Sequence, residues 1–160
     1  MALSEYERAR ERVLWYLDRS DRTEKELRDR LRRGGFEQGV CDEVLARLCE
    51  VGVVDDRRYA LRFAERCMEA NISRRQTYAK LLAKGISREL ANEALDANET
   101  DEVAQVKAVI AKKYALKLAD PENTQKVYAA LIRKGFSYGA VRDALKEYSE
   151  ELEYSGEEYV

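Results

Sequence analysis

The chain has 160 residues, of which 45% are hydrophobic and 38% are charged, so it can bury a core beneath a strongly solvated surface. Its formal net charge of −2 favours neither a nucleic acid nor a membrane as a partner on overall balance alone. The sequence contains no histidine and no phosphate-binding GxGxxG or GxxxxGK[ST] motif, so we expect neither an enzyme nor a bound metal or cofactor.

The sequence repeats itself at intervals of 50 residues. Two columns hold only leucine: Leu31, Leu81 and Leu131, and Leu45, Leu95 and Leu145. A third column holds only glycine: Gly35, Gly85 and Gly135. Leucine columns indicate a buried helix face, and glycine is the residue that ends a helix at positive φ. We therefore predict an all-α protein of three tandem three-helix, helix-turn-helix-like repeats at 1–54, 55–99 and 100–153, followed by an acidic tail at 154–160.

The first predicted repeat opens with a helix whose apolar residues lie three and four apart: Tyr6, Ala9, Val13 and Leu17. Thr23 is the expected N-cap of the second helix, and Glu26 completes a capping box three residues later. This helix should end at Gly35, with Phe36 folded back over its end. Val40, Val44 and Leu48 then mark the buried face of the third helix.

In the second predicted repeat, Asp55 and Asp56 are good caps for an opening helix. The apolar residues of that helix recur at a spacing of four: Tyr59, Phe63 and Cys67. Ser73 and Gln76 form the second expected capping box. Leu90 and Ala94 mark the third helix.

The third predicted repeat follows the same pattern, with an opening helix on Val103, Val106, Ile110 and Tyr114. Asn123 occupies the N-cap column of the second helix, and Lys126 breaks the capping box. We expect the acidic tail to be frayed, although Tyr154 and Tyr159 are alternative anchors.

Each repeat of about 50 residues is too small to bury much core alone, so we expect the repeats to stack into an elongated, curved array, as a monomer. Cys41, Cys49 and Cys67 show no CxxC spacing, and we interpret them as small core hydrophobes with free thiols. Free thiols indicate a reducing compartment, and no segment has the length of a signal peptide or a membrane span. We therefore expect a cytoplasmic protein.

Positive charge is concentrated in the second and third predicted repeats. Residues 57–88 hold nine basic and two acidic residues, a net of +7, and residues 103–146 hold nine and three, a net of +6. The first 56 residues carry −3, and residues 147–160 carry −6. A nearly neutral chain can thus present a basic track beside acidic ends.

Any single cation of this track is explained by solvation of a helix surface. We interpret the 57–88 block as functional because a local +7 attracts anionic partners and because the arginine fork suits carboxylate or phosphate. Spacing leaves open whether the partner offers phosphates or an acidic protein surface. The predicted contacts are Arg32, Arg33, Arg57, Arg58, Arg62, Arg66, Arg74, Arg75, Lys80, Lys84, Arg133 and Lys134.

Four stretches resemble the RecX family of recombinase modulators. DRTEKELRDRLRRGGF (Asp21 to Phe36) is similar to the opening repeat of that family, and VGVVDDRRYALRFAERC (Val51 to Cys67) resembles its Asp-Asp junction. ISRRQTYAKLLAKGIS (Ile72 to Ser87) resembles its second repeat, and LIRKGFSYGAVRDAL (Leu131 to Leu145) its closing repeat. The family often has Gly where this chain has Asn71, which also tolerates left-handed geometry.

The resemblance implies a non-enzymatic protein of three three-helix repeats that binds RecA recombinase filaments on DNA along their groove. Such proteins limit filament growth or favour disassembly, which reduces ATP hydrolysis, strand exchange and the co-protease activity of the SOS response. The family has no catalytic residues to carry over. The predicted contacts that match its basic positions are Arg57, Arg58, Arg62, Arg66, Arg74, Arg75, Arg133 and Lys134.

Two other interpretations remain open. An independent nucleic-acid-binding module is one, because a three-helix unit can imitate a helix-turn-helix. Against it, the third helices, QGVCDEVLARL and RELANEALDAN, are acidic or apolar, and the net charge is acidic. The other is a helical-repeat scaffold for an unrelated partner.

Overall fold

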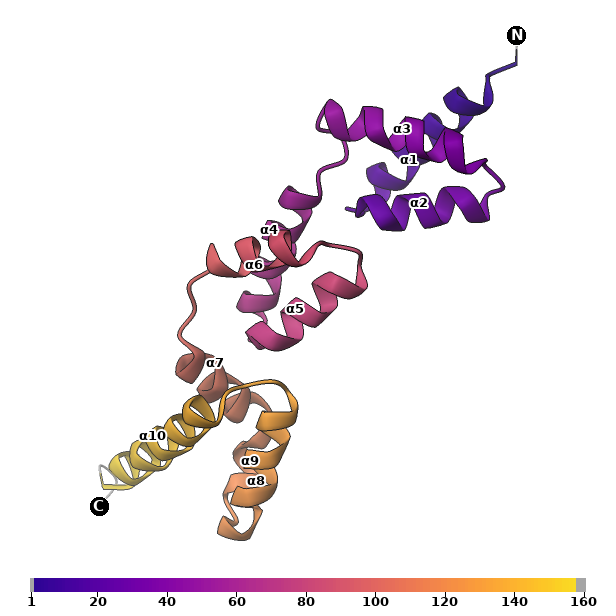
Figure 1. Ribbon diagram of the computed structural model, residues 1–160. Coiled ribbons are helices and arrows are strands. Elements are labelled where there is room, and N and C mark those ends of the chain that lie inside the picture. Colours follow the sequence, from indigo (N-terminus) through magenta and orange to yellow (C-terminus); the bar gives the residue numbers. More distant parts are fainter. Residues whose placement is uncertain (1, 158–160) are drawn as a thin grey trace. The chain divides into compact units, whose positions relative to one another are not determined.

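The computed structural model describes residues 2–157, in which every regular element is a helix (Figure 1). The first six are α1 (Glu5–Arg19), α2 (Glu24–Arg33), α3 (Gln38–Glu50), α4 (Asp56–Glu69), α5 (Arg74–Ala83) and α6 (Arg88–Asp96). After these come α7 (Glu102–Val109), the π-helical turn η1 (Ile110–Tyr114) and α8 (Ala115–Leu118). The 3₁₀ turn η2 (Pro121–Asn123), α9 (Thr124–Arg133) and α10 (Tyr138–Glu157) complete the chain. The prediction of tandem three-helix repeats is confirmed.

The chain forms two compact units. One consists of Met1–Phe63 and Ala79–Ala97, and the other of Ala64–Tyr78 and Asn98–Val160. Helices α4 and α5 therefore contribute to both units, and the second predicted repeat is shared between them. The repeat boundaries given above stay a prediction.

Each unit contains a core built from the predicted leucine columns. In the first unit, Leu31 and Leu45 are completely buried together with residues of α1 and α3. In the second unit, Leu131 is completely buried beside residues of α7 and η1, and Leu145 is partly buried against the same cluster. A fully buried leucine stabilises a fold by about 1.5–3 kcal/mol relative to an exposed one, so these columns supply much of the driving force.

The predicted glycine turns are all present. Gly35, Gly85 and Gly135 have φ of +87°, +88° and +95°. After each glycine, the next residue donates its N–H to the carbonyl of the residue five positions earlier, which is the Leu31, Leu81 or Leu131 of the first leucine column. This is the Schellman arrangement, and it satisfies carbonyls that the helix end leaves without a partner. Asn71 ends α4 in the same way, with φ +57°.

Two of the three predicted second-helix caps form as expected. The Thr23 hydroxyl accepts from the N–H of Glu26 at 3.2 Å, and the Glu26 carboxylate accepts from the N–H of Thr23. The Ser73 hydroxyl accepts from the N–H of Gln76 at 3.1 Å. Before α4, the Asp55 carboxylate accepts from the N–H of Arg58.

The predicted cap at Asn123 is wrong. Asp120 and Pro121 start η2, which runs directly into α9, so Asn123 has helical backbone angles instead of the extended ones that an N-cap needs. Its side-chain amide donates to the carbonyl of Lys117 at 3.0 Å. The opening helix of this repeat also differs from expectation, because the π-helical turn η1 divides it into α7 and α8.

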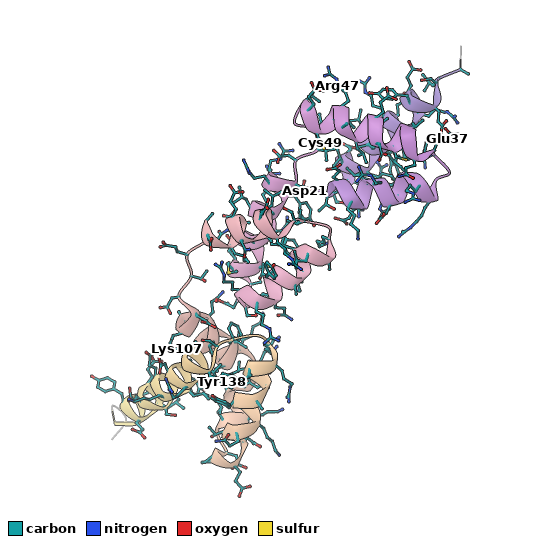
Figure 2. All side chains as sticks on the ribbon, viewed as in Figure 1. Asp21, Glu37, Arg47, Cys49, Lys107 and Tyr138 are labelled. Carbon is teal, nitrogen blue, oxygen red and sulfur yellow. The ribbon has the colours of Figure 1, made fainter. Side chains whose placement is uncertain are left out.

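Helix α10 is longer than the predicted third helix and continues to Glu157. Lys107 of α7 forms ion pairs with Glu147 and Glu151, which hold the acidic part of α10 against the repeat (Figure 2). Tyr154 is helical and its side chain is exposed, whereas Tyr159 lies outside the described residues. No helix within residues 2–157 has the length and apolar character needed to cross a membrane.

Two junctions join the start of one repeat's second helix to the end of the next repeat's second helix. In the first unit, the Thr23 hydroxyl donates to the carbonyl of Lys84 at 2.6 Å. In the second unit, the Ser73 hydroxyl donates to the carbonyl of Lys134 at 2.6 Å. Each buried hydroxyl thus caps its own helix and also satisfies a carbonyl of the following repeat. At each junction, the positive end of one helix macrodipole lies beside the negative end of another, and this arrangement is electrostatically favourable.

Asp56 supports the first junction, because its carboxylate accepts from the N–H of Glu24 at 2.9 Å. Burial raises the pKa of Asp56 above its ordinary value, and the negative charges of Glu24, Asp55 and Glu26 act in the same direction, while the hydrogen bond opposes them. A carboxyl whose folded pKa is raised binds its proton more tightly in the native state, so its contribution to stability grows as pH falls.

We expect Asp56→Asn to raise the urea midpoint of unfolding at pH 7. The asparagine Oδ1 can still accept from the Glu24 N–H, and the half-buried charge is gone. The advantage should shrink as pH falls through the raised pKa towards the ordinary value of 3.8, because wild-type Asp56 then becomes neutral. Urea unfolding followed by circular dichroism between pH 7 and pH 3.5 measures this. A stability difference that is constant over that range would contradict the prediction.

Candidate functional site

The four predicted arginines of α4 do not share one environment. Arg57 Nε lies 3.2 Å from the Glu93 carboxylate of α6, and both side chains are exposed. Arg62 lies 3.7 Å from the carboxylate of Asp21, which precedes α2 and is labelled in Figure 2. Exposed ion pairs contribute little to stability, so both arginines can exchange their partners at low cost. Arg58 donates to the carbonyl of Gly52 at 3.5 Å.

Arg58, Arg62 and Arg66 follow one another at four-residue spacing along α4, which places them on one side of this helix. Arg57 is out of register with this row. Arg58 and Arg62 also border a small recess with Tyr59 in the first unit. We call Arg58, Arg62 and Arg66 the α4 arginine row. It is the part of the predicted set in which exposed cations are most regularly arranged.

Cations at the ends of α2 and α5 have a structural explanation as well. Arg32 and Arg33 lie in the last turn of α2, and Lys80 in the last turn of α5, where the negative end of the macrodipole favours positive charge. Their side chains are exposed. Lys84 is half-buried, and its Nζ lies 5.6 Å from the ring centroid of Phe63. Lys84 is therefore part of the junction with Thr23, and only part of its side chain is open to a partner.

The second unit brings four predicted cations together at the α5–α9 junction. Arg75 lies directly over the Gly135 turn, where its Cβ is 3.3 Å from the position that a β-carbon on Gly135 would occupy. The preceding Ser73 binds Lys134, so Arg74 and Arg75 at the start of α5 lie beside Arg133 and Lys134 at the end of α9. Two arginines in a first turn oppose their own helix dipole, so the stability of α5 does not explain them.

A basic cleft in the third repeat contains residues that the predicted set left out. It has a volume of about 500 Å³ and is lined by Tyr114, Lys117, Lys126, Arg133 and apolar residues of α9. Only Arg133 was among the predicted contacts. No acidic residue is among those lining it. The net charge of +6 over residues 103–146 was the signal for this cleft, and the packing of α8 on α9 is what brings Lys117 to the two cations of α9.

The thiols offer no reactive chemistry. Cys41 and Cys67 are buried, Cys49 is half-buried, and all three are free. Burial raises the pKa of the Cys49 thiol to about 11, and the carboxylates of Glu24 and Asp56 add to the effect. Burial likewise raises the pKa of Cys41. Because the thiolate is the nucleophile and the metal ligand, a raised pKa makes Cys41 and Cys49 less reactive, and they act as small packing groups.

Comparison with known protein families gives three matches in series. The model of the first three-helix domain of RecX matches residues 9–48, that of the second matches 55–95, and that of the third matches 99–145. These matches follow the order of the helices in the chain.

Individual relatives agree with the family models. A protein of Mycobacterium ulcerans named regulatory protein RecX is 34% identical over 139 residues, which cover 84% of this chain and 80% of that protein. The regulatory protein RecX of Streptomyces lividans is 31% identical over 160 residues, covering 95% of this chain and 85% of that protein. The crystal structure of RecX from Lactobacillus salivarius has the same fold, with a TM-score of 0.80 at 24% identity, over 89% of this chain and 96% of that one. The chain therefore belongs to the RecX family of regulatory proteins.

Proposed function

We propose that this protein regulates RecA recombinase by binding RecA filaments on DNA, without catalytic chemistry of its own. Binding along the filament groove would limit filament growth or favour disassembly and so reduce ATP hydrolysis, strand exchange and co-protease activity. Recombination, repair and the SOS response would then be tuned by how much of this protein is present. The protein would act in the cytoplasm, as a monomer.

One observation carries the proposal: the side chains of most of the predicted basic contacts are exposed at the surface. Ten of the twelve predicted contacts have exposed side chains, and only Lys84 and Lys134 are half-buried. The α4 arginine row and the α5–α9 junction present guanidinium groups, which bind carboxylates and phosphates through paired hydrogen bonds. A RecA filament on DNA offers both kinds of anion, and many weak contacts along a repeating surface add up.

The experiment is a titration of this protein into DNA-dependent ATP hydrolysis by RecA from the same source. We expect the rate to fall at well below one copy per RecA subunit, because a regulator that acts on an assembled filament affects many subunits at once. No fall in rate, even at one copy per subunit, would contradict the proposal.

A second candidate function is direct binding of single-stranded DNA, which the third-repeat basic cleft favours. Lys117, Lys126 and Arg133 provide three positive charges around Tyr114 in a cleft lined by no carboxylate. Grooves that combine cations with an aromatic ring suit a nucleic-acid backbone and its bases. This function is compatible with filament binding, because the filament itself contains DNA.

We expect Lys117→Gln with Lys126→Gln to weaken binding of a single-stranded oligonucleotide and to reduce the slope of log K against log salt by about 1.4, or about 0.7 for each phosphate that is no longer neutralised. Fluorescence anisotropy at several salt concentrations measures both. Lys112→Gln with Lys113→Gln is the matched control, because these exposed lysines lie on η1 but do not line the cleft. Equal losses in the two variants would show that only net charge matters.

A further inference from the structure

The two repeat junctions have the same construction. At each, a helix N-terminus with a Thr or Ser cap meets the glycine turn that ends the next repeat's second helix. A β-carbon on Gly85 would collide with the Cβ and Cδ of Lys25, and one on Gly135 would lie 2.6 Å from Ser73 Oγ. Lys25 and Arg75 are both the second residue of the incoming helix, and their side-chain stems cover the two glycines.

The incoming segment also contacts the opening helix of the repeat that receives it. In the first unit, Asp21 pairs with Arg62 of α4, and the N–H of Glu24 donates to Asp56 of α4. In the second unit, Gln105 of α7 donates to the sulfur of Met68, which precedes the Ser73 cap. A receiving site therefore consists of a glycine turn together with the opening helix of the same repeat.

The first repeat has the same two components, but they form an open cleft. Gly35 has φ +87°, as Gly85 does, yet among the described residues no atom beyond its neighbours lies within 4 Å of the position of its β-carbon. The cleft beside it has a volume of about 820 Å³ and is lined by Gly34, Gly35, Phe36 and Arg30 from the end of α2 and by one side of α1. It therefore has the two components of a receiving site, while the position beside Gly35 that Lys25 and Arg75 fill at the junctions is open.

The chemistry of this cleft favours an acidic occupant. The α1 side contributes Arg8, Arg12 and Trp15, and the α2 side contributes Arg30. Two glutamates also line it, of which Glu5 already accepts from the N–H of Glu37 at the start of α3. The side chain of Trp15 is half exposed, with the guanidinium of Arg19 3.5 Å from its ring centroid. Helix N-termini commonly carry acidic residues in their first turn, as α2 does with Glu24 and Glu26.

We propose that the Gly35 cleft is a docking site for the N-terminus of an α-helix from a partner protein, one with a Ser or Thr cap and an acidic first turn. The cap hydroxyl would donate to the carbonyl of Gly34, the counterpart of Lys84 and Lys134. The side chain of the second helical residue would cover Gly35, and the first-turn carboxylates would meet Arg8, Arg12 and Arg30. This docking is independent of whether the partner is a recombinase.

A second copy of this chain fits the cleft less well. The third repeat, which would supply the equivalent helix start, has Asn123 in a helical conformation with its amide bound to Lys117, so it offers no hydroxyl. Helix α1 does start with a Ser cap and acidic residues, but its second residue, Tyr6, packs against the core of its own repeat. We assign the occupant to a different protein; the start of α6 in a second copy, which has the Ser87 cap and Glu89 in its first turn, is the alternative that the self-association outcome below decides.

A synthetic peptide with the sequence of residues 21–33 is the probe, because this segment already fills the equivalent site at Gly85. Trp15, the only tryptophan in the chain, reports its arrival by fluorescence. We expect a saturable change with the full-length protein. Changing the threonine of the peptide to valine, which removes the hydroxyl, should weaken binding at least tenfold. A peptide of residues 72–84, whose first turn is basic, should bind at least fivefold more weakly than the first peptide.

The decisive variant is Gly35→Ala, because a β-carbon there has room in the free protein but would collide with the incoming side chain. Gly52→Ala is the matched control: it has φ +80° and equally open surroundings, so it carries the same backbone strain outside the cleft. We expect at least tenfold weaker peptide binding for Gly35→Ala and unchanged binding for Gly52→Ala. No saturable change up to millimolar peptide, or equal affinity for both variants, would overturn the proposal. Self-association that Gly35→Ala abolishes would assign the cleft to a second copy and overturn it too.

Discussion

Reversing Arg57, Arg58, Arg62 and Arg66 of α4 to glutamate is expected to abolish inhibition of RecA by this protein while leaving its helical content unchanged. A hydrogen bond between charged groups contributes about 1.5–3 kcal/mol, and reversal replaces attraction by repulsion, so the loss of affinity should exceed about a hundredfold. The four side chains are exposed, and the ion pairs of Arg57 and Arg62 lie at the surface, so the fold should tolerate the change.

The structure also predicts how the effect divides among the four. Arg58→Glu with Arg62→Glu should remove most of the inhibition, because both belong to the α4 arginine row. Arg57→Glu alone should change inhibition by less than about threefold, because Arg57 lies out of register beside Glu93. RecA ATP hydrolysis measures inhibition, and far-ultraviolet circular dichroism measures helical content.

A control separates this surface from a simple effect of charge. Arg10→Glu, Arg47→Glu and Arg142→Glu together reverse three exposed arginines outside the predicted set. This variant should inhibit as wild type does. Full inhibition by the fourfold α4 variant would assign the contacts to another surface, whereas equal loss in the control would leave only long-range attraction as the cause.

The fold could be predicted from the sequence because its signals are local and recur three times. Leucine columns, capping residues and the glycine turns each follow from a short stretch of chain, and agreement among three copies separates them from chance. The third repeat departs from this pattern at two places, where other local structures replace the expected cap and the expected regular helix. Asp120 caps a 3₁₀ turn that starts at Pro121, so the helical backbone already includes Asn123. In the opening helix of this repeat, the π-helical turn η1 interrupts the regular α-helix. Neither feature can be recognised from the spacing of apolar residues along the sequence.

The candidate site could be predicted only as a set of cations. Charge counting found the basic segments, but it could not tell Arg57 from Arg58, because Arg57 pairs with Glu93 of α6 whereas Arg58 donates to the carbonyl of Gly52. It also missed Lys126, which lies two turns before Arg133 on α9, and Lys117, which becomes a neighbour of these cations only through the packing of α8 on α9. The double use of Thr23 and Ser73 depends on partners 61 residues away, which no local motif encodes.

Gly85→Ala and Gly135→Ala are expected to destabilise the protein far more than Gly35→Ala. All three glycines have φ between +87° and +95°, where an L-residue with a β-carbon is strained by about 1–2 kcal/mol. At Gly35 this backbone strain accounts for the whole expected loss of stability. At Gly85 the new methyl group also meets the stem of Lys25, and at Gly135 it meets the hydroxyl of Ser73.

The additional cost comes from the junction hydrogen bonds. If the helix start moves away to make room, the buried hydroxyl of Thr23 or Ser73 is left without its carbonyl acceptor, and an unsatisfied buried polar group costs about 1–3 kcal/mol. We therefore expect losses of about 2–5 kcal/mol at Gly85 and Gly135 against about 1–2 kcal/mol at Gly35. Urea unfolding of the three variants measures the free energies.

Glycine is required at Gly85 and Gly135 for two reasons: the positive φ and the close approach of the incoming helix. Variants that lack the cap hydroxyl can separate these two contributions. Thr23→Val removes the junction hydrogen bond and leaves the glycine turn intact, so Gly85→Ala should cost less in that background than in wild type. The strain at positive φ would remain, whereas a hydrogen bond that is already absent could not be broken again. A Gly85→Ala cost equal to that of Gly35→Ala in wild type would mean that Lys25 moves aside freely, and that the second glycine of the column serves only to end its helix.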